Sequence, residues 1–194
     1  IMHDPSLTQG MKYGLMRYNQ TETVSQYDDW ADWYYSSNPN SGIPLPNSTD
    51  YIYYYLDDGC SKDGDLLVEC GANTVSLITD WIDGTENYPN NKELRGEGAT
   101  PIANTLLSAK DYYEGNLATF PSPISEVCQN SYVILLTDGQ ETCGGDPAGA
   151  AGQLRSVSYD SDSTSKTYDV KTFVIGLALA IDQQQQLDDI AIAG

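Results

Sequence analysis

Residues 131–145, SYVILLTDGQETCGG, constrain the fold of this chain more than any other segment. Positions 132–136 are apolar without polar alternation, which predicts a strand buried on both faces in a parallel sheet covered by helices. The strand stops at an acidic turn, Thr137-Asp138-Gly139. Ligands of open α/β sheets collect at the carboxyl ends of the strands, and a carboxylate placed there suits a hard cation. Asp138 is therefore a candidate metal ligand.

The charge balance narrows the classes of partner. The chain has 28 acidic residues against 9 Lys and Arg, a net charge of −19. A field of that sign repels nucleic acid and anionic lipid and attracts cations. No apolar run approaches the roughly 18 residues that a membrane span needs. With a single histidine, His3, and no CxxC pair, the sequence also argues against a zinc site.

Other segments alternate between strand and helix patterns, as is typical of an α/β layered domain. The predicted strands are 11–19, 51–56, 65–69, 131–137 and 170–177, with 51–56 and 65–69 joined as a hairpin. The predicted helices are 73–82, one that opens at Thr100-Pro101, 147–157 and 180–193, and 159–169 is predicted to be a polar loop. The 194 residues fit a single domain, 1–194, with an insertion at about 20–50.

The insertion has two parts by composition. Residues 25–35 predict a short helix with Tyr27, Trp30, Ala31 and Tyr34 on one face, and residues 36–50 predict a loop. Its aromatic residues, with the YIYYY run that follows, suit either a binding patch for carbohydrate or protein, or ordinary packing against the sheet.

The helix that opens at Thr100-Pro101 has the clearest start signal. Threonine is a good N-cap and proline suits the first helical position. Apolar residues then recur at helical spacing, at Ile102, Leu106, Ala109 and Tyr113.

Four cysteines, abundant tyrosine, scarce lysine and long polar loops favour an extracellular or cell-surface protein with disulfides. Cys60 and Cys70 flank a polar turn and are the predicted pair. Cys128 and Cys143 lie at opposite ends of the predicted buried strand, roughly 20 Å apart at about 3.3 Å per residue. Their pairing requires the loop after Asp138 to fold back and is left open, as is a partner for Cys143 upstream of Ile1.

Three segments together resemble a von Willebrand factor A (vWA) domain: GEGATPIANTLLSAKDYY, YVILLTDGQETCGG and VKTFVIGLALAIDQQQQLDDIAIAG. The resemblance implies a Rossmann-like fold, with a mostly parallel sheet flanked by helices and a metal-ion-dependent adhesion site (MIDAS) at its top. The metal ligands of that family are a DxSxS motif, a threonine and an aspartate after a buried strand. Thr100 and Asp138 match the last two.

A narrower resemblance covers MKYGLMRYNQ, LLVECGANTVSLITDWI and CQNSYVILLTDGQETC, which look like the vWA region of PilY-type proteins. Those are adhesins at the tip of bacterial type IV pili that also assist pilus assembly. The resemblance implies an extracellular, non-enzymatic adhesion or interaction module at a pilus tip. Its implied partners are a protein ligand or host receptor and minor pilin subunits.

The DxSxS motif is the main departure from the family. Residues 4–8 spell DPSLT, but only Gln9 and Gly10 separate them from the next strand, which leaves no room for the family's helix. The run DSDSTS at 160–165 is out of register. We therefore expect an N-terminally incomplete domain whose first central strand, with DxSxS and its helix, lies upstream of Ile1. Loss of that strand exposes two inner sheet edges.

The resemblance implies Mg²⁺ as the cation, with Mn²⁺ or Ca²⁺ as alternatives. Mg²⁺ prefers six oxygen ligands and keeps several waters, so a partner's acidic side chain has a position to occupy. Two other functions are weighed: a structural filament or tip-assembly component with a vestigial site, and an acidic metal-dependent hydrolase. The hydrolase lacks a G-x-S-x-G elbow and a P-loop. The acidic runs at 57–65 and 160–162 suit solvated surface better than calcium sites.

Overall fold

A computed structural model shows a mixed α/β chain. It describes residues 10–18, 22–27, 41–44, 51–56, 60, 64–84, 94, 99–160, 165–178 and 181–194. Its strands are β1 (Tyr13–Arg17), β2 (Glu22–Tyr27), β3 (Ser41–Pro44), β4 (Tyr51–Leu56), β5 (Asp65–Gly71), β6 (Ser131–Thr137), β7 (Val157–Asp160), β8 (Ser165–Tyr168) and β9 (Val170–Gly176). Its helices are α3 (Val75–Thr79), α4 (Ile102–Glu114), α5 (Pro147–Leu154) and α6 (Ile181–Ala193).

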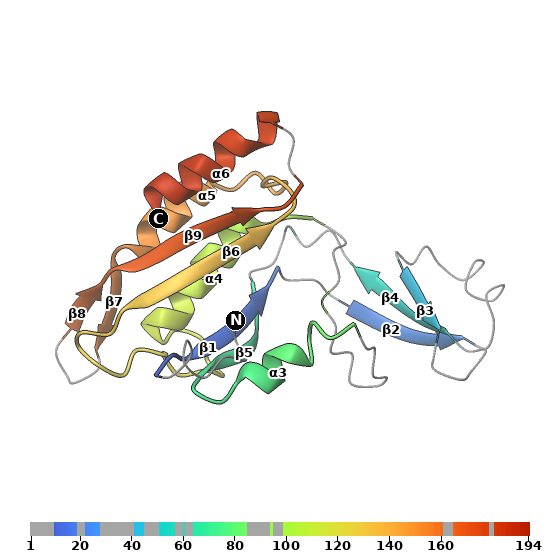
Figure 1. The fold of residues 1–194 in the computed structure, drawn as a ribbon, viewed down its shortest axis with the longest axis horizontal. Coiled ribbons are helices and arrows are strands. Elements are labelled where there is room, and N and C mark those ends of the chain that lie inside the picture. Colours follow the sequence, from blue (N-terminus) through green and yellow to red (C-terminus); the bar gives the residue numbers. More distant parts are fainter. Residues whose placement is uncertain are drawn as a thin grey trace.

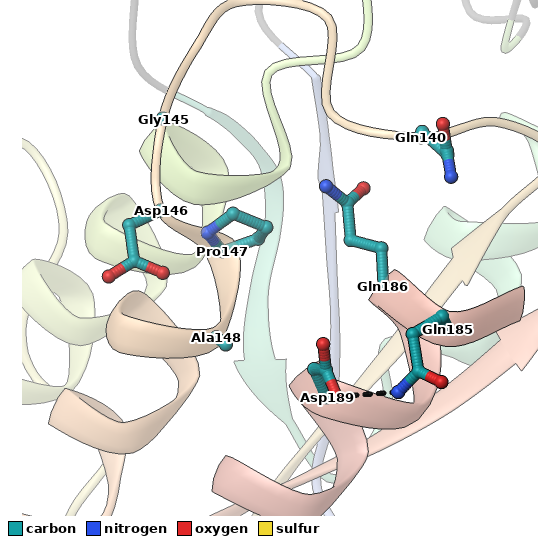
Figure 2. Close-up of a pocket in the computed structure, with 8 residues that line it drawn as sticks. All are labelled: Gln140, Gly145, Asp146, Pro147, Ala148, Gln185, Gln186 and Asp189. Atoms are coloured by element: carbon teal, nitrogen blue, oxygen red, sulfur yellow. Dashed lines mark hydrogen bonds between the residues drawn. The ribbon is translucent and has the colours of Figure 1, made fainter. Parts of the chain in front are cut away.

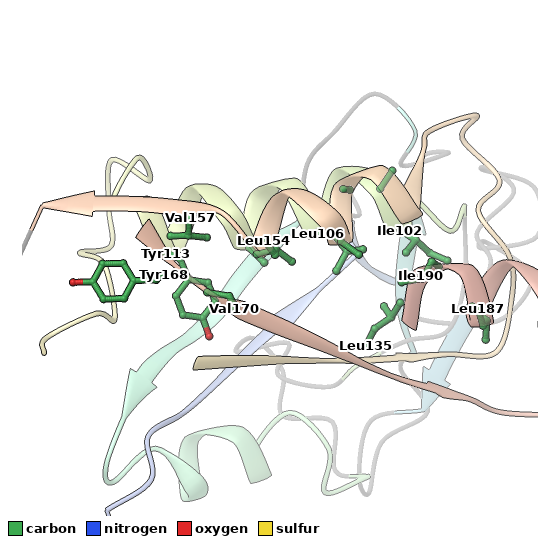
Figure 3. Close-up of a cluster of buried hydrophobic side chains, with 14 of the residues drawn as sticks. Ile102, Leu106, Tyr113, Leu135, Leu154, Val157, Tyr168, Val170, Leu187 and Ile190 are labelled. Atoms are coloured by element: carbon green, nitrogen blue, oxygen red, sulfur yellow. The ribbon is translucent and has the colours of Figure 1, made fainter. Parts of the chain in front are cut away.

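The parallel pair β6–β9 forms the centre of the fold, in register from Ser131 opposite Val170 to Thr137 opposite Gly176. Helices α4, α5 and α6 lie together on one face of this pair (Figure 1). Apolar side chains from the helices and strands meet there in one core, which includes Ile102, Leu106, Leu135, Leu154, Val170 and Ile190 (Figure 3). We call this side of β6–β9 the covered face.

The apolar face predicted for helix α4 is buried, as expected. Ile102, Leu106, Ala109 and Tyr113 are all buried, at 9% exposure or less. The helix ends at Gly115, whose φ of 72° is left-handed and favours glycine. The amide of Asn116 then donates to the carbonyl of Asp111 at 2.8 Å, which satisfies one of the last carbonyls of the helix.

The prediction that residues 131–137 are buried on both faces is wrong for the described residues. Every second side chain of β6 and β9 points away from the helices and is largely exposed. These side chains, with the residue after β9, are Tyr132, Ile134, Leu136, Phe173, Ile175 and Leu177, between 47% and 67% exposed. Tyr132 and Phe173 contact each other across the strands, with ring centroids 5.8 Å apart. We call this side the open face.

The predicted hairpin of 51–56 with 65–69 is also wrong. Strand β5 pairs with β1, antiparallel, whereas β4 pairs with β2 and β3 in a separate sheet. Two side-chain contacts hold β1 beside β5: the Thr74 hydroxyl donates to the carbonyl of Tyr13, and Arg17 pairs with Asp65 at 3.4 Å. Residues 51–56 are a strand as predicted, but in the insertion's own sheet.

Inside the insertion, β2 occupies 22–27, where the predicted helix was to begin at 25, and β3 occupies 41–44, where a loop was predicted. The strong pairing of both strands with β4 overrides local helix and turn preferences. Residues 28–40, with Trp30 and Tyr34, lie outside the described residues. The predicted polar loop at 159–169 is instead largely the β7–β8 hairpin, which also ends α5 earlier than predicted.

None of the described helices has the length and apolar character that a membrane crossing requires.

Candidate functional site

Both predicted metal ligands belong to segments that lie together at the carboxyl end of β6. Thr100 precedes α4, and Asp138 follows β6. The amide of Thr100 donates to the Thr142 hydroxyl at 2.7 Å, and the amide of Thr142 donates to the Thr100 carbonyl at 3.2 Å. The Thr100 hydroxyl also lies 3.5 Å from the point where a Cβ on Gly139 would sit. Thr100 is therefore held alongside the turn that carries Asp138.

The turn after β6 is shaped by Thr137. Its side chain is buried, and its hydroxyl donates to the carbonyl of Gly139 at 3.1 Å and accepts from the amide of Gly139 at 3.3 Å. The carbonyl of Thr137 accepts from the amide of Leu177 at 2.8 Å, which continues the pairing with β9. Asp138, between these anchored residues, is left exposed to solvent. The TDG sequence thus presents one carboxylate outward on a fixed backbone.

Thr100 is not the N-cap of α4, contrary to the prediction. The cap position is taken by Pro101, whose side chain cannot accept a hydrogen bond. Glu141 supplies the missing acceptor from the next loop, since its Oε2 accepts from the amide of Ala103 at 2.8 Å. A carboxylate at a helix N-terminus is favoured by the unpaired amides and the helix dipole. Thr100 is consequently free of the capping role.

Sequence reasoning missed Glu141. Its Oε1 accepts from the amide of Cys143 at 2.8 Å, and its own amide donates to Gln186 Oε1 on α6 at 2.8 Å. No local pattern indicates this role, because Ala103 lies 38 residues away in the chain. A sequence clue was the proline at the start of α4, which leaves that helix without a side-chain cap of its own.

The disulfide joins Cys60 to Cys143, with Cα atoms 5.1 Å apart. The predicted Cys60–Cys70 pair is wrong, because the hairpin that was to bring them together does not form. The loop after Asp138 does fold back, but toward Cys60 rather than Cys128. Cys70 and Cys128 are free thiols. Burial raises the pKa of the Cys70 thiol, although a hydrogen bond with Tyr112 opposes the rise.

Tyr18 lies between the end of β1 and the end of β6. Burial raises the pKa of Tyr18 above its ordinary value, and the carboxylates of Asp138 and Glu141 add to the rise, while Thr137 opposes it. The hydroxyl of Tyr18 is nevertheless buried without a partner of good hydrogen-bond geometry among the described residues. Tyr18 therefore places β1 close to the candidate site.

A cavity of about 480 Å³ adjoins the site without containing Thr100 or Asp138. Figure 2 shows its lining, from the loop at Gln140, the start of α5 and the face of α6. The two carboxylates that line the cavity both accept hydrogen bonds from nearby residues: Asp146 from the amide of Gly149, and Asp189 from the Gln185 side chain. The cavity itself offers no free cluster of charge.

The described residues contain no cluster of three His, Cys, Asp or Glu side chains that could hold a metal. Thr100 and Asp138 could offer a hydroxyl and a carboxylate, which are oxygen ligands of the kind that Mg²⁺ prefers, and a bound Mg²⁺ would need its remaining ligands from water or other residues. Asp4 and most of the acidic residues considered for calcium lie outside the described residues. Asp65 is instead paired with Arg17.

Comparisons with known proteins show no family. No family model matches the chain, and no solved structure matches it. The chain is similar to "Uncharacterized protein YwmD" of Bacillus subtilis (strain 168), with 29% identity over 102 residues. That match covers 53% of this chain and 38% of the relative, so the chain spans well under two thirds of the relative's length.

Proposed function

We propose that this chain is a cell-surface adhesion or protein-interaction module of vWA type, which binds a protein partner through a metal-ion-dependent adhesion site. The observation that carries the proposal is the meeting of Thr100 with the Asp138–Gly139 turn at the carboxyl end of β6. A hydroxyl and a carboxylate are hard oxygen ligands, suited to Mg²⁺, with Mn²⁺ and Ca²⁺ as alternatives.

The metal would bridge two proteins rather than catalyse a reaction. An exposed carboxylate and one hydroxyl leave coordination positions for water and for an acidic side chain of the partner. The net charge of −19 favours cation uptake but opposes an acidic partner at long range, so the metal itself supplies the local attraction. The resemblance to PilY-type proteins supports a role for this activity at a type IV pilus tip, outside the cell.

We further propose that a β–α segment outside the described residues completes the sheet. Among the described residues β6 pairs only with β9, and β1 pairs only with β5, so each has an open edge. Figure 1 shows β1 pointing in the same direction as β6, on the side of β6 away from β9. Tyr18 after β1 lies near Thr137 at the end of β6. A strand between β1 and β6 would pair both edges.

The handedness of chain crossovers supports the same segment. The connection from β6 to β9 runs through α5 on the covered face (Figure 1). Crossovers between parallel strands are right-handed in about 98% of cases. A strand between β6 and β1 that continued into β1 would step across the sheet in the opposite direction. Its helix would then lie on the opposite side, which is the exposed apolar open face.

This arrangement would make the end of β6 a topological switch point. From the added strand the chain would proceed toward β1, whereas from β6 it proceeds toward β9. Ligands of open α/β sheets bind in the crevice at such a reversal. The added strand would end beside Asp138 and Thr100, where its own polar residues could supply the missing metal ligands.

The test is a titration of Mg²⁺ and Mn²⁺ into the longer protein that includes the upstream segment. We expect Asp138→Ala and Thr100→Ala each to weaken binding about tenfold or more, since each removes an oxygen ligand. Asp188→Ala, an exposed carboxylate of α6, is the matched control and should bind as the unmodified protein does. Equal affinity in Asp138→Ala and the control would refute the site, and metal-dependent hydrolysis lost in Asp138→Ala would refute the non-enzymatic role.

A further inference from the structure

We propose that Glu141 is a positioning residue for the Thr100–Asp138 site, an inference that rests on the proposed function. The described hydrogen bonds of the Glu141 carboxylate go to Ala103 and Cys143 and not to the predicted ligands themselves. Glu141 connects the segment that carries Thr100 to the loop that carries Asp138, and its carboxylate oxygens are divided between them.

One carboxylate oxygen of Glu141 fixes the start of α4. Oε2 accepts from the amide of Ala103 at 2.8 Å, three residues after Thr100. Because Pro101 at the cap position has no side-chain acceptor, Glu141 is the side chain that satisfies this amide. The position of Thr100 relative to the loop therefore depends on where Glu141 holds the helix.

The other oxygen fixes the loop itself. Oε1 accepts from the amide of Cys143 at 2.8 Å, which closes a tight turn between Glu141 and Cys143. Cys143 is in turn bonded to Cys60. The amide of Glu141 donates to Gln186 on α6, so the loop is also held to the helix layer. The loop thus has three anchors within a few residues of Asp138.

The chemistry of these contacts requires a carboxylate. Each oxygen of Glu141 accepts from a backbone amide, and neither donates. Glutamine offers one accepting oxygen and one NH₂ group, which would point a donor at the second amide. Glu141→Gln keeps the size and shape of the side chain and breaks one of the two contacts. It therefore separates the role of the carboxylate from simple packing.

The experiment compares the unmodified longer protein, Glu141→Gln and Glu126→Gln. Glu126 is an exposed residue before β6, at the opposite end of the strand from the site, and serves as the matched control. We expect Glu141→Gln to bind Mn²⁺ about tenfold more weakly, the usual scale for residues that orient metal ligands. Hydrogen exchange without metal should be faster at the amides of Ala103 or Cys143 and unchanged in Glu126→Gln.

The outcomes are distinguishable. Equal Mn²⁺ affinity in Glu141→Gln and the unmodified protein would overturn the inference and leave the proposed function intact. A loss of affinity that matches a global loss of stability, with exchange accelerated throughout the chain, would also overturn it, because the role would then be structural. If the unmodified protein binds no Mn²⁺, the proposed function fails, and the site that Glu141 would serve fails with it.

Discussion

The two faces of the β6–β9 pair differ in the polarity of their side chains, and the face exposed to water is the more uniformly apolar one. The covered face includes three buried polar residues, Ser131, Thr137 and Thr172. The open face carries only large apolar side chains apart from Lys171, and they are about half exposed or more. In a finished domain the more apolar face of a sheet is normally the one removed from water.

The difference leaves large apolar side chains of β6 and β9 in water on the open face. Five large apolar side chains on the two paired strands, together with Leu177 just after β9, are exposed on this one side, and a large exposed apolar patch is the kind that marks a contact with another element. Of the polar side chains on the covered face, Thr137 is satisfied by Gly139, whereas the Thr172 hydroxyl is buried without a hydrogen-bond partner among the described residues. The comparison between the faces can be tested at neighbouring residues.

The largest effect is expected from adjacent leucines on opposite faces. Leu135 is 6% exposed and Leu136 is 56% exposed. Leu135→Ala should lower the free energy of unfolding by about 2–5 kcal/mol, as buried leucines do, because it leaves a cavity in the core. Leu136→Ala in the 194-residue chain should cost about 1 kcal/mol or less, because its side chain is already in water. Urea unfolding followed by circular dichroism measures both.

The same two variants sharpen the comparison when they are made in a protein that carries the proposed upstream segment. If an upstream helix covers the open face, the cost of Leu136→Ala should rise toward that of Leu135→Ala. Equal small costs in the short and the longer protein would show that the open face stays exposed. Similar large costs in the short chain would contradict the difference between the faces.

A smaller loss of stability is expected at alkaline pH, through two buried tyrosines of α4. Burial raises the pKa of Tyr112 and of Tyr113 well above the ordinary value near 10. These groups contribute stability that is fully present below about pH 10 and is lost as the pH rises toward their folded-state pKa, because the unfolded chain ionises first. Urea midpoints should therefore fall between pH 9.5 and 11.5. Tyr113→Phe should flatten that fall, and an unchanged slope would contradict the assignment.

The smallest effect is expected from Arg155 and Asp169, an exposed pair near the start of β9. Arg155 donates to both carboxylate oxygens of Asp169, and this hydrogen bonding lowers the pKa of Asp169. The contribution is present above the ordinary aspartate pKa and lost on acidification. Because both groups are solvent-exposed, Asp169→Asn should leave the urea midpoint at pH 7 within error. A clear shift there would show that this edge is less solvated than the structure indicates.

Local patterns predicted several elements of the fold well. The helical spacing of Ile102, Leu106, Ala109 and Tyr113 identified the buried face of α4, and the apolar runs identified β6 and β9 as strands. Pairing was harder, because it depends on residues far apart in the chain. Strand β5 joined β1 rather than its neighbour β4, and the sequence between β4 and β5 looked like a plausible hairpin turn. The prediction of burial failed at β6 because an apolar run does not show whether helices cover one face of the strand or both.

The candidate site also has parts that the sequence predicted and parts that depend on distant contacts. The place of Asp138 after an apolar strand made it a candidate, and the resemblance added Thr100; the described contacts hold Thr100 beside the turn that carries Asp138. The Cys60–Cys143 disulfide and the contact of Glu141 with Ala103 were not predictable, because they join residues that are 83 and 38 positions apart in the chain. Only the folding back of the loop after Asp138, raised as a condition for pairing Cys143, anticipated this arrangement. Metal binding by the site stays a prediction.

The disulfide has a consequence for how this molecule can diversify. Cys60, just beyond the insertion, is bonded to the loop that carries Asp138, and Tyr18, just before the insertion, lies beside the same loop. The strands described within the insertion pair only with one another. The residues that flank the insertion on both sides therefore lie near the loop that carries Asp138. We expect substitutions in the insertion to change the surroundings of Asp138 while the pairings of β1 with β5 and of β6 with β9 stay intact.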